Sequence, residues 1–172
     1  MAKYEVKFYK GDYSDRQRQA NADGCVAYVE QHFNSSSSPT ANYALVITGR
    51  NASETSKNWG RWYAQSIARE FNIPVGGRDG GILVGGFNGR GDANVRYTRM
   101  PAILLEPLFG SNPAHAQWIR SESGQTRLAT ILSESVQRFF QDGGLIGFSI
   151  GHIYKTSRPN DRGAAIFGGG WQ

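Results

Sequence analysis

Residues 25–39 read CVAYVEQHFNSSSSP, and this stretch decides the fold class. Its first part is apolar and β-branched, and it ends in a histidine before polar, turn-forming residues. That order is expected of a buried strand followed by a loop. Side chains on a strand alternate between two faces, so Glu30 and His32 point the same way. A carboxylate beside an imidazole at the end of a buried strand indicates a chemical role for this strand end.

Strand-like and helix-like segments alternate outward from this run. Further strands are expected at residues 4–9 (YEVKFY), 44–48 (ALVIT), 102–106 (AILLE) and 145–150 (LIGFSI). Helices are expected at residues 14–23, with Ser14 as the cap, at 58–71 and at 124–140. Residues 76–94 predict a glycine-rich loop around a short strand, and residues 151–172 predict an irregular loop. The alternation predicts an α/β fold: a single domain over residues 1–172 whose mostly parallel, twisted sheet is flanked by helices.

Composition and charge exclude several classes of protein. A single cysteine, Cys25, excludes a disulfide framework or a cysteine-based zinc knuckle within one chain. No apolar run reaches the roughly 20 residues that span a bilayer, and the charged N-terminus does not predict a signal peptide. The net charge of +5 favours anionic partners, including cell-envelope polymers. The basic residues are scattered and carry no nucleic-acid-binding signature, so no nucleic-acid partner is expected.

Three polar residues follow or end the expected strands, namely His32, Glu106 and His152. Sites in open α/β sheets form outside the carboxyl ends of the strands. Two imidazoles and a carboxylate match the open zinc site of a hydrolase, and a further glutamate would then act as general acid and base. Each residue alone is also consistent with a hydrogen-bonded strand end that has no function.

Two blocks of the sequence resemble one known family. Residues 15–35, DRQRQANADGCVAYVEQHFNS, are similar to an R…AN…AD…SIHAN block, and residues 96–113, RYTRMPAILLEPLFGSNP, to a PAVLVELGFLSN block. Both blocks belong to the zinc-dependent N-acetylmuramoyl-L-alanine amidases of the amidase-3 group. The resemblance implies that His32 is a zinc ligand, that Glu106 is the catalytic residue and that Asn112 matches the asparagine after it.

The chain departs from this family at its N-terminus. Members open with a strand, a G-H-G-G loop that bears the first zinc histidine, and a glutamate ligand on the first helix. Residues 1–24 contain no histidine, whereas residues 145–172, LIGFSIGHIYKTSRPNDRGAAIFGGGWQ, resemble that opening. The resemblance therefore implies a circular permutation, in which His152 is the first zinc ligand and residues 4–9 form the family's second strand.

The third zinc ligand stays open between several donors. The family's glutamate would fall near Gln172, whose amide binds zinc poorly. Glu30 shares a face with His32, and it would either bind the metal or orient a ligand. The α-carboxylate of Gln172 is a further candidate. His115 is expected to cap or pack a helix rather than bind metal.

The resemblance implies hydrolysis of the amide between N-acetylmuramic acid and L-alanine in peptidoglycan. Zinc (Zn²⁺) would polarise the carbonyl, and Glu106 would move the proton from water to the leaving amine. Four arginines are candidates to meet peptide carboxylates: Arg78, Arg90, Arg96 and Arg99. A small, basic, monomeric amidase is typical of a phage endolysin, made in the bacterial cytoplasm without a signal peptide and released to the wall. The alternative is a catalytically inactive wall-binding module of the same fold.

Overall fold

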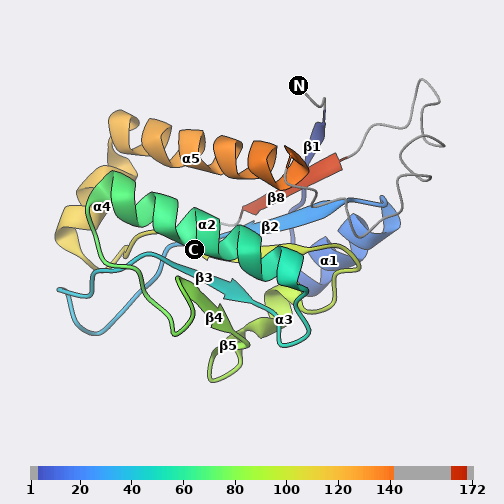
Figure 1. Ribbon diagram of the computed structural model, residues 1–172, viewed down its shortest axis with the longest axis horizontal. Coiled ribbons are helices and arrows are strands. Elements are labelled where there is room, and N and C mark those ends of the chain that lie inside the picture. The colour runs from blue at the N-terminus through green and yellow to red at the C-terminus, as the bar shows by residue number, and fades with distance from the viewer. Residues whose placement is uncertain (1–3, 142–163, 170–172) are drawn as a thin grey trace.

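A computed structural model describes residues 4–141 and 164–169 (Figure 1). The elements follow in the order β1 (Glu5–Phe8), α1 (Tyr13–Ala22), β2 (Ala27–Gln31), β3 (Leu45–Thr48), α2 (Glu54–Phe71), β4 (Ile82–Val84), β5 (Gly86–Phe87), β6 (Arg90–Gly91), α3 (Asp92–Val95), β7 (Ala102–Glu106), α4 (Pro113–Arg120), α5 (Glu122–Gln141) and β8 (Ala164–Gly169). No helix in these ranges is long and apolar enough to cross a membrane.

The main sheet has six strands in the order β1-β8-β2-β7-β3-β4. Every neighbouring pair is parallel except β3 and β7, which are antiparallel. The strands β5 and β6 form a separate two-stranded hairpin. This arrangement confirms the predicted α/β fold with a mostly parallel sheet flanked by helices.

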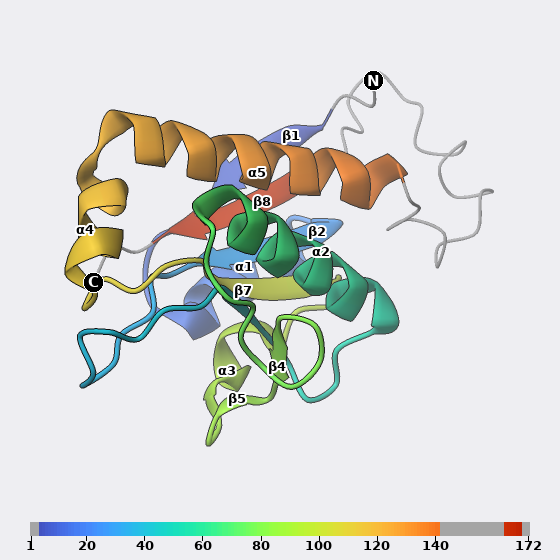
Figure 2. The ribbon, with the colours of Figure 1, turned by 60° about the vertical axis from the view of Figure 1, so that its left-hand side comes forward.

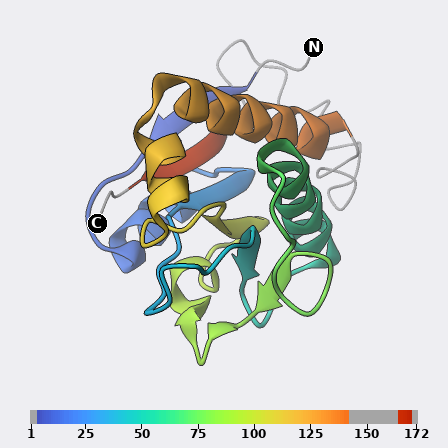
Figure 3. The same ribbon diagram turned by 90° about the vertical axis from the view of Figure 1, so that its left-hand side faces the viewer.

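Helices cover both faces of the sheet, so the central strands are apolar on both faces (Figure 3). On one face, Val29 and Ile103 pack against the helices α2 and α5, through side chains such as Ile67. On the other face, Tyr28 and Leu104 pack in a second cluster with residues of α1 and α3. Glu30 is buried in the same strand, so its burial needs polar partners.

The strand β8 lies between β1 and β2 and is parallel to both (Figure 1, Figure 2). It pairs Ala164 with Glu5 on one side and Ala165 with Ala27 on the other. The expectation of an irregular tail is therefore wrong for Ala164–Gly169. Its glycines and alanines are weak strand signals by themselves, but two parallel neighbours supply its backbone hydrogen bonds. The predicted strand at residues 145–150 lies outside the described residues.

Two helix starts differ from the sequence-based expectation. Asp12, not Ser14, caps α1, because its Oδ1 accepts hydrogen bonds from the backbone N–H of Ser14 (2.8 Å) and of Asp15 (3.1 Å). Helix α2 begins at Glu54 rather than at residue 58, after the N-cap Ser53. In both cases the capping side chain decides where the helix begins, and the apolar spacing does not.

Two further regions contain more structure than expected. The glycine-rich residues 76–94 contain the expected short strand β4, but also the β5–β6 hairpin and the short helix α3. The helix α4 precedes the predicted helix, which begins at Glu122 as α5. Asn112 caps α4, and Pro113 occupies its first position, a favourable start for a helix.

The position of β8 between β1 and β2 predicts that the sheet is disrupted without it. Deleting residues 164–172 would leave the facing edges of β1 and β2 without their parallel partner. We expect this deletion to abolish the cooperative urea transition followed by circular dichroism. Deleting residues 170–172 alone is the matched control and should preserve it. A cooperative transition with an unchanged midpoint in the longer deletion would contradict the pairing of β8 with β1 and β2.

Candidate active site

The carboxyl ends of β2 and β7 meet at one edge of the sheet. The strands are parallel with Gln31 opposite Leu105, and the backbone N–H of His32 donates to the carbonyl of Leu105 at 3.1 Å. His32 therefore follows β2 directly beside Glu106, the last residue of β7. Strand alternation places Glu30, His32 and Glu106 on the face that also holds Tyr28 and Leu104. The fold thus brings the predicted imidazole and carboxylates together.

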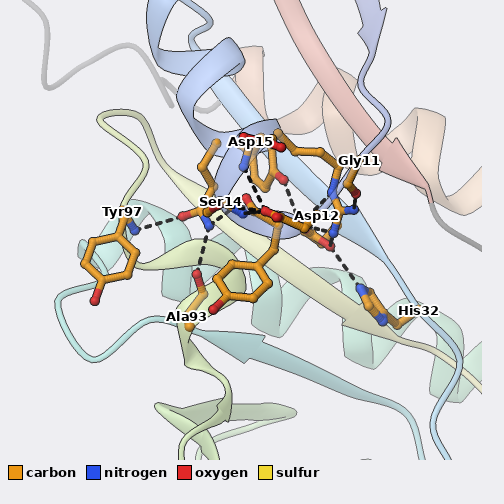
Figure 4. Close-up of polar contacts among 12 residues, drawn as sticks. Gly11, Asp12, Ser14, Asp15, His32, Ala93 and Tyr97 are labelled. Atoms are coloured by element: carbon orange, nitrogen blue, oxygen red, sulfur yellow. Dashed lines mark hydrogen bonds and ion pairs between the residues drawn. The ribbon is translucent and has the colours of Figure 1, made fainter.

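Glu30 is buried and is the centre of a polar cluster. Figure 4 draws polar contacts of this region, with His32 labelled. Arg16 Nη2 lies 3.0 Å from each carboxylate oxygen, and Arg16 Nε lies 3.2 Å from Oε1. The hydroxyl of Tyr28 donates to Oε1 at 2.7 Å, and His32 Nε2 lies 2.9 Å from Oε2. The predicted pairing of Glu30 with His32 on one face is therefore a direct contact between the two side chains.

The charge of Glu30 is stabilised by these partners. Burial by itself raises the pKa of the Glu30 carboxyl, but hydrogen bonds from His32 and Tyr28 and the charge of Arg16 outweigh it. The net effect lowers the pKa, so Glu30 is an ionised acceptor. Each of its oxygens already accepts at least two hydrogen bonds. This favours the orienting role for Glu30 over the role of metal ligand.

Glu106 has the opposite environment. Its Oε2 is buried and has no hydrogen-bond partner among the described residues. Burial raises the pKa of the Glu106 carboxyl to about 7, although the nearby His32 and Arg90 partly offset this. A carboxyl group that titrates near neutrality can both accept and return a proton. The two carboxyl groups on this face therefore differ: Glu30 is held as an ionised acceptor, whereas burial favours the protonated form of Glu106.

The metal-binding residues are incomplete within the described ranges. No three histidine, cysteine, aspartate or glutamate side chains in residues 4–141 and 164–169 come close enough to hold a metal ion. His32 fits one part of such a site, since an imidazole suits zinc, and Glu106 lies beside it as a neighbouring carboxyl rather than as a ligand. His152 and Gln172, the other candidate donors, lie outside the described residues.

His115 has the packing role expected of it. The ring is 2 % exposed, its Nδ1 accepts from the backbone N–H of Phe109 at 3.0 Å, and its Nε2 lies 3.0 Å from Oδ1 of Asn42. Because Nδ1 accepts, Nε2 carries the proton and donates to Asn42. Burial lowers the pKa of His115, so the ring is neutral and both nitrogens are used.

The four candidate arginines lie in different parts of the fold and differ in whether their charge acts on Glu106. Arg90 is the one whose charge acts on Glu106. Arg96 forms an ion pair with the buried Asp92 at 2.9 Å, and Arg99 precedes β7, at the end of the strand opposite to Glu106. Arg78 is exposed on the glycine-rich segment. Among the four, only Arg90 has an electrostatic effect on Glu106.

Sequence reasoning missed Arg16, Tyr28 and Asn34. Arg16 and Tyr28 hold Glu30, and Nδ2 of Asn34 is buried with no partner among the described residues. The sequence pattern gave no signal for Arg16, because α1 is polar almost throughout and its buried side, with Gln17 and Ala20, is defined only by the fold. Tyr28 and Asn34 share the strand alternation of Glu30 and His32, so the same period-two pattern extends to them.

Comparisons with known proteins agree with this fold and these blocks. A family model described as N-acetylmuramoyl-L-alanine amidase (Amidase_3) matches residues 3–138. The catalytic domain of CwlV, an N-acetylmuramoyl-L-alanine amidase from Bacillus (Paenibacillus) polymyxa var. colistinus, is 25% identical with a TM-score of 0.62. The match covers 77% of this chain and 68% of that chain.

Two other solved structures are similar. An N-acetylmuramoyl-L-alanine amidase from Clostridium difficile 630 is 25% identical with a TM-score of 0.65, over 77% of this chain and 67% of that chain. The amidase Ami1 from Mycobacterium smegmatis is 19% identical with a TM-score of 0.64, over 77% and 65%, a likeness of fold. A search of curated proteins gave no significant match.

The raised pKa of Glu106 predicts a pH-dependent stability. A carboxyl whose folded-state pKa, about 7, exceeds its ordinary value of 4.5 stabilises the fold below about pH 4.5 and loses this contribution as the pH rises through 7. Glu106→Gln replaces the carboxyl with an amide that does not ionise, so the variant does not lose this stability as the pH rises. In metal-free protein, we expect the urea midpoint of the variant to rise relative to wild type between about pH 5 and about pH 8.

The exposed Glu134 on α5 provides the matched control. Glu134→Gln removes a carboxyl from the exposed face of α5 and should change the midpoint equally at both pH values. If the Glu106→Gln and wild-type midpoints change in parallel with pH, Glu106 does not titrate near neutrality.

Proposed function

The chain belongs to the Amidase_3 family of N-acetylmuramoyl-L-alanine amidases, and on that premise we propose that it is a zinc-dependent peptidoglycan hydrolase. Its substrate bond is the amide between N-acetylmuramic acid and L-alanine. The observation that supports this most is the place of Glu106 beside His32, with a buried carboxyl oxygen that has no hydrogen-bond partner in the described part of the chain.

In the proposed reaction, Glu106 moves the proton. As a carboxylate it takes a proton from the attacking water, and as the acid it returns that proton to the departing nitrogen of L-alanine. A pKa near the working pH suits both steps. A bound zinc ion supplies the Lewis acid that polarises the scissile carbonyl. Arg90, whose charge acts on Glu106, is a candidate to meet a carboxylate of the stem peptide.

The proposed zinc ligands are His32 and His152, with the third donor open. His32 would bind through the ring nitrogen that does not contact Glu30. Glu30 stays a candidate donor, but its two oxygens already accept from Arg16, Tyr28 and His32. We therefore favour an orienting role for it and a third donor near Gln172.

We also propose that the chain is circularly permuted relative to the family. The family model matches residues 3–138, so β8 lies beyond the matched residues although it is inserted between β1 and β2 in the sheet. A strand that opens the chain in the family would be supplied here from the C-terminal side. The resemblance gives this strand as residues 145–150, with His152 directly after it, whereas the strand described between β1 and β2 is Ala164–Gly169, which follows His152 in the chain. The assignment of His152 as the first zinc ligand therefore belongs to the form of the proposal in which residues 145–150 are that strand.

The biological setting is proposed from the resemblance alone. A phage endolysin would be made in the bacterial cytoplasm and would act on the wall after release. The net charge of +5 would favour contact with anionic envelope polymers. We also propose that the chain acts as a monomer.

The first test is catalytic. We expect Glu106→Gln to lower the release of L-alanine-terminated peptides from purified peptidoglycan by about 10²–10⁴-fold, since it removes the proton acceptor. Bound zinc should stay at the wild-type level, and the Glu134→Gln control should keep wild-type activity. Near wild-type hydrolysis by Glu106→Gln would show that Glu106 is not the catalytic residue. Wall binding without hydrolysis by the wild type would favour the inactive binding module.

The second test concerns the metal. We expect His32→Ala to lose stoichiometric zinc by mass spectrometry, because it removes a proposed ligand. His115→Ala is the control: it removes a buried imidazole that already uses both nitrogens, and it should keep zinc. His115→Ala should instead lower the free energy of unfolding by about 1–3 kcal/mol. Unchanged zinc content in His32→Ala would refute the ligand assignment.

A further inference from the structure

We infer that Arg16 and Tyr28 are positioning residues for His32. Through the carboxylate of Glu30 they hold the imidazole proton on Nε2, which leaves Nδ1 as the atom that binds the metal. The metal-binding half of this inference rests on the proposed function. The half that concerns the proton rests on the contacts within the chain.

The first step is the capacity of the Glu30 carboxylate to accept hydrogen bonds. Its Oε1 accepts from Arg16 Nε at 3.2 Å, from Arg16 Nη2 at 3.0 Å and from the Tyr28 hydroxyl at 2.7 Å. Its Oε2 accepts from Arg16 Nη2 at 3.0 Å. An ionised carboxylate offers only acceptors, about four lone-pair sites in all. The side chain is therefore held in one orientation, with Oε2 turned to His32.

The second step assigns the imidazole proton. His32 Nε2 lies 2.9 Å from Oε2 of Glu30, and a contact with an oxygen that only accepts requires an N–H on the ring. In the neutral ring the single proton is then on Nε2. No hydrogen bond joins Nδ1 to any residue in the described ranges, and its lone pair is available. A metal-bound histidine commonly donates its other ring N–H to a carboxylate in this way.

The third step concerns the reason for burying the charged pair of Arg16 and Glu30. The side chains of Arg16 and Glu30 are 11% and 1% exposed. A buried ion pair is weak evidence for stability, because well-packed apolar residues often replace such a pair without loss. The pair is explained if Glu30 must stay ionised beside His32. Tyr28 then holds the carboxylate through Oε1, an oxygen that His32 does not use.

Arg16 is itself fixed by the chain around it. Its Nη1 donates to the carbonyl of Gly11, in the loop before α1. The next residue, Gln17, ties α1 to the α3 region: its Nε2 donates to the carbonyl of Ala93 at 2.8 Å, and its Oε1 accepts from the N–H of Tyr97 at 2.9 Å (Figure 4). The guanidinium therefore reaches Glu30 from a helix held at both sides, which is expected of a positioning group.

The experiment measures the tautomer of His32 and the affinity for zinc separately. In metal-free protein at about pH 8.5, above the ordinary imidazole range, long-range ¹H–¹⁵N NMR should show His32 as the Nε2–H tautomer. In Glu30→Gln the amide can also donate to the ring, so the signal should move toward a mixture of tautomers. The assay of zinc affinity is competition with a chromogenic chelator, applied to wild type, Arg16→Gln, Tyr28→Phe and a control.

We expect Arg16→Gln and Tyr28→Phe to weaken zinc binding by about 10–100-fold. Tyr28→Phe keeps the buried ring and removes only the hydroxyl, so it stays informative if Arg16→Gln does not fold. The matched control is Arg18→Gln, on the same helix, whose side chain is 74% exposed and paired with Asp15. It should bind zinc as the wild type does.

The outcomes separate this inference from the proposed function. An Nδ1–H tautomer in the wild type overturns the inference, whatever the zinc result. Zinc bound with unchanged affinity in both Arg16→Gln and Tyr28→Phe overturns the positioning role but leaves the amidase proposal intact. An Nε2–H tautomer in a wild type that binds no zinc overturns the zinc-dependent mechanism and the metal-binding half of the inference, and supports the half that concerns the proton.

Discussion

The parallel pairing of β2 with β7 is the constraint on which the candidate site depends. Its register places Gln31 opposite Leu105, so both strands end at the same edge and His32 comes beside Glu106. A shift of one residue in either strand would turn its polar side chains to the opposite face, onto α2 and α5. The apolar residues at alternate positions, Val29 and Ile103, prevent that shift because they are buried against those helices.

Two buried carboxyl groups on one face have opposite surroundings. Glu30 accepts from an arginine, a tyrosine and a histidine, which keeps its pKa low, whereas burial raises the pKa of Glu106 to about 7 and one of its oxygens has no partner among the residues that the structure describes. Such a divergence between neighbouring titratable groups is a common sign of divided roles in an active site. Here one carboxyl is suited to hold an imidazole and the other to transfer a proton.

The place of β8 connects the fold to the family. The matched part of the chain, residues 3–138, contains the other five strands of the main sheet, but β1 and β2 are joined only through the strand Ala164–Gly169. Pairing of segments so distant along the chain carries a loop-closure cost, which the two parallel ladders of β8 must offset. The sheet that presents His32 and Glu106 therefore depends on residues from both ends of the chain.

The sequence by itself determined the fold class, the strands β1, β2, β3 and β7, and the pairing of Glu30 with His32, because period-two alternation and apolar runs are local. It also indicated Glu106, since a strand end is visible in the chain. The tertiary structure decided which strands are neighbours, the insertion of β8, and the burial of Arg16 against Glu30. These depend on contacts between residues distant in sequence. No local pattern contains the low-dielectric surroundings that separate the pKa of Glu30 from that of Glu106.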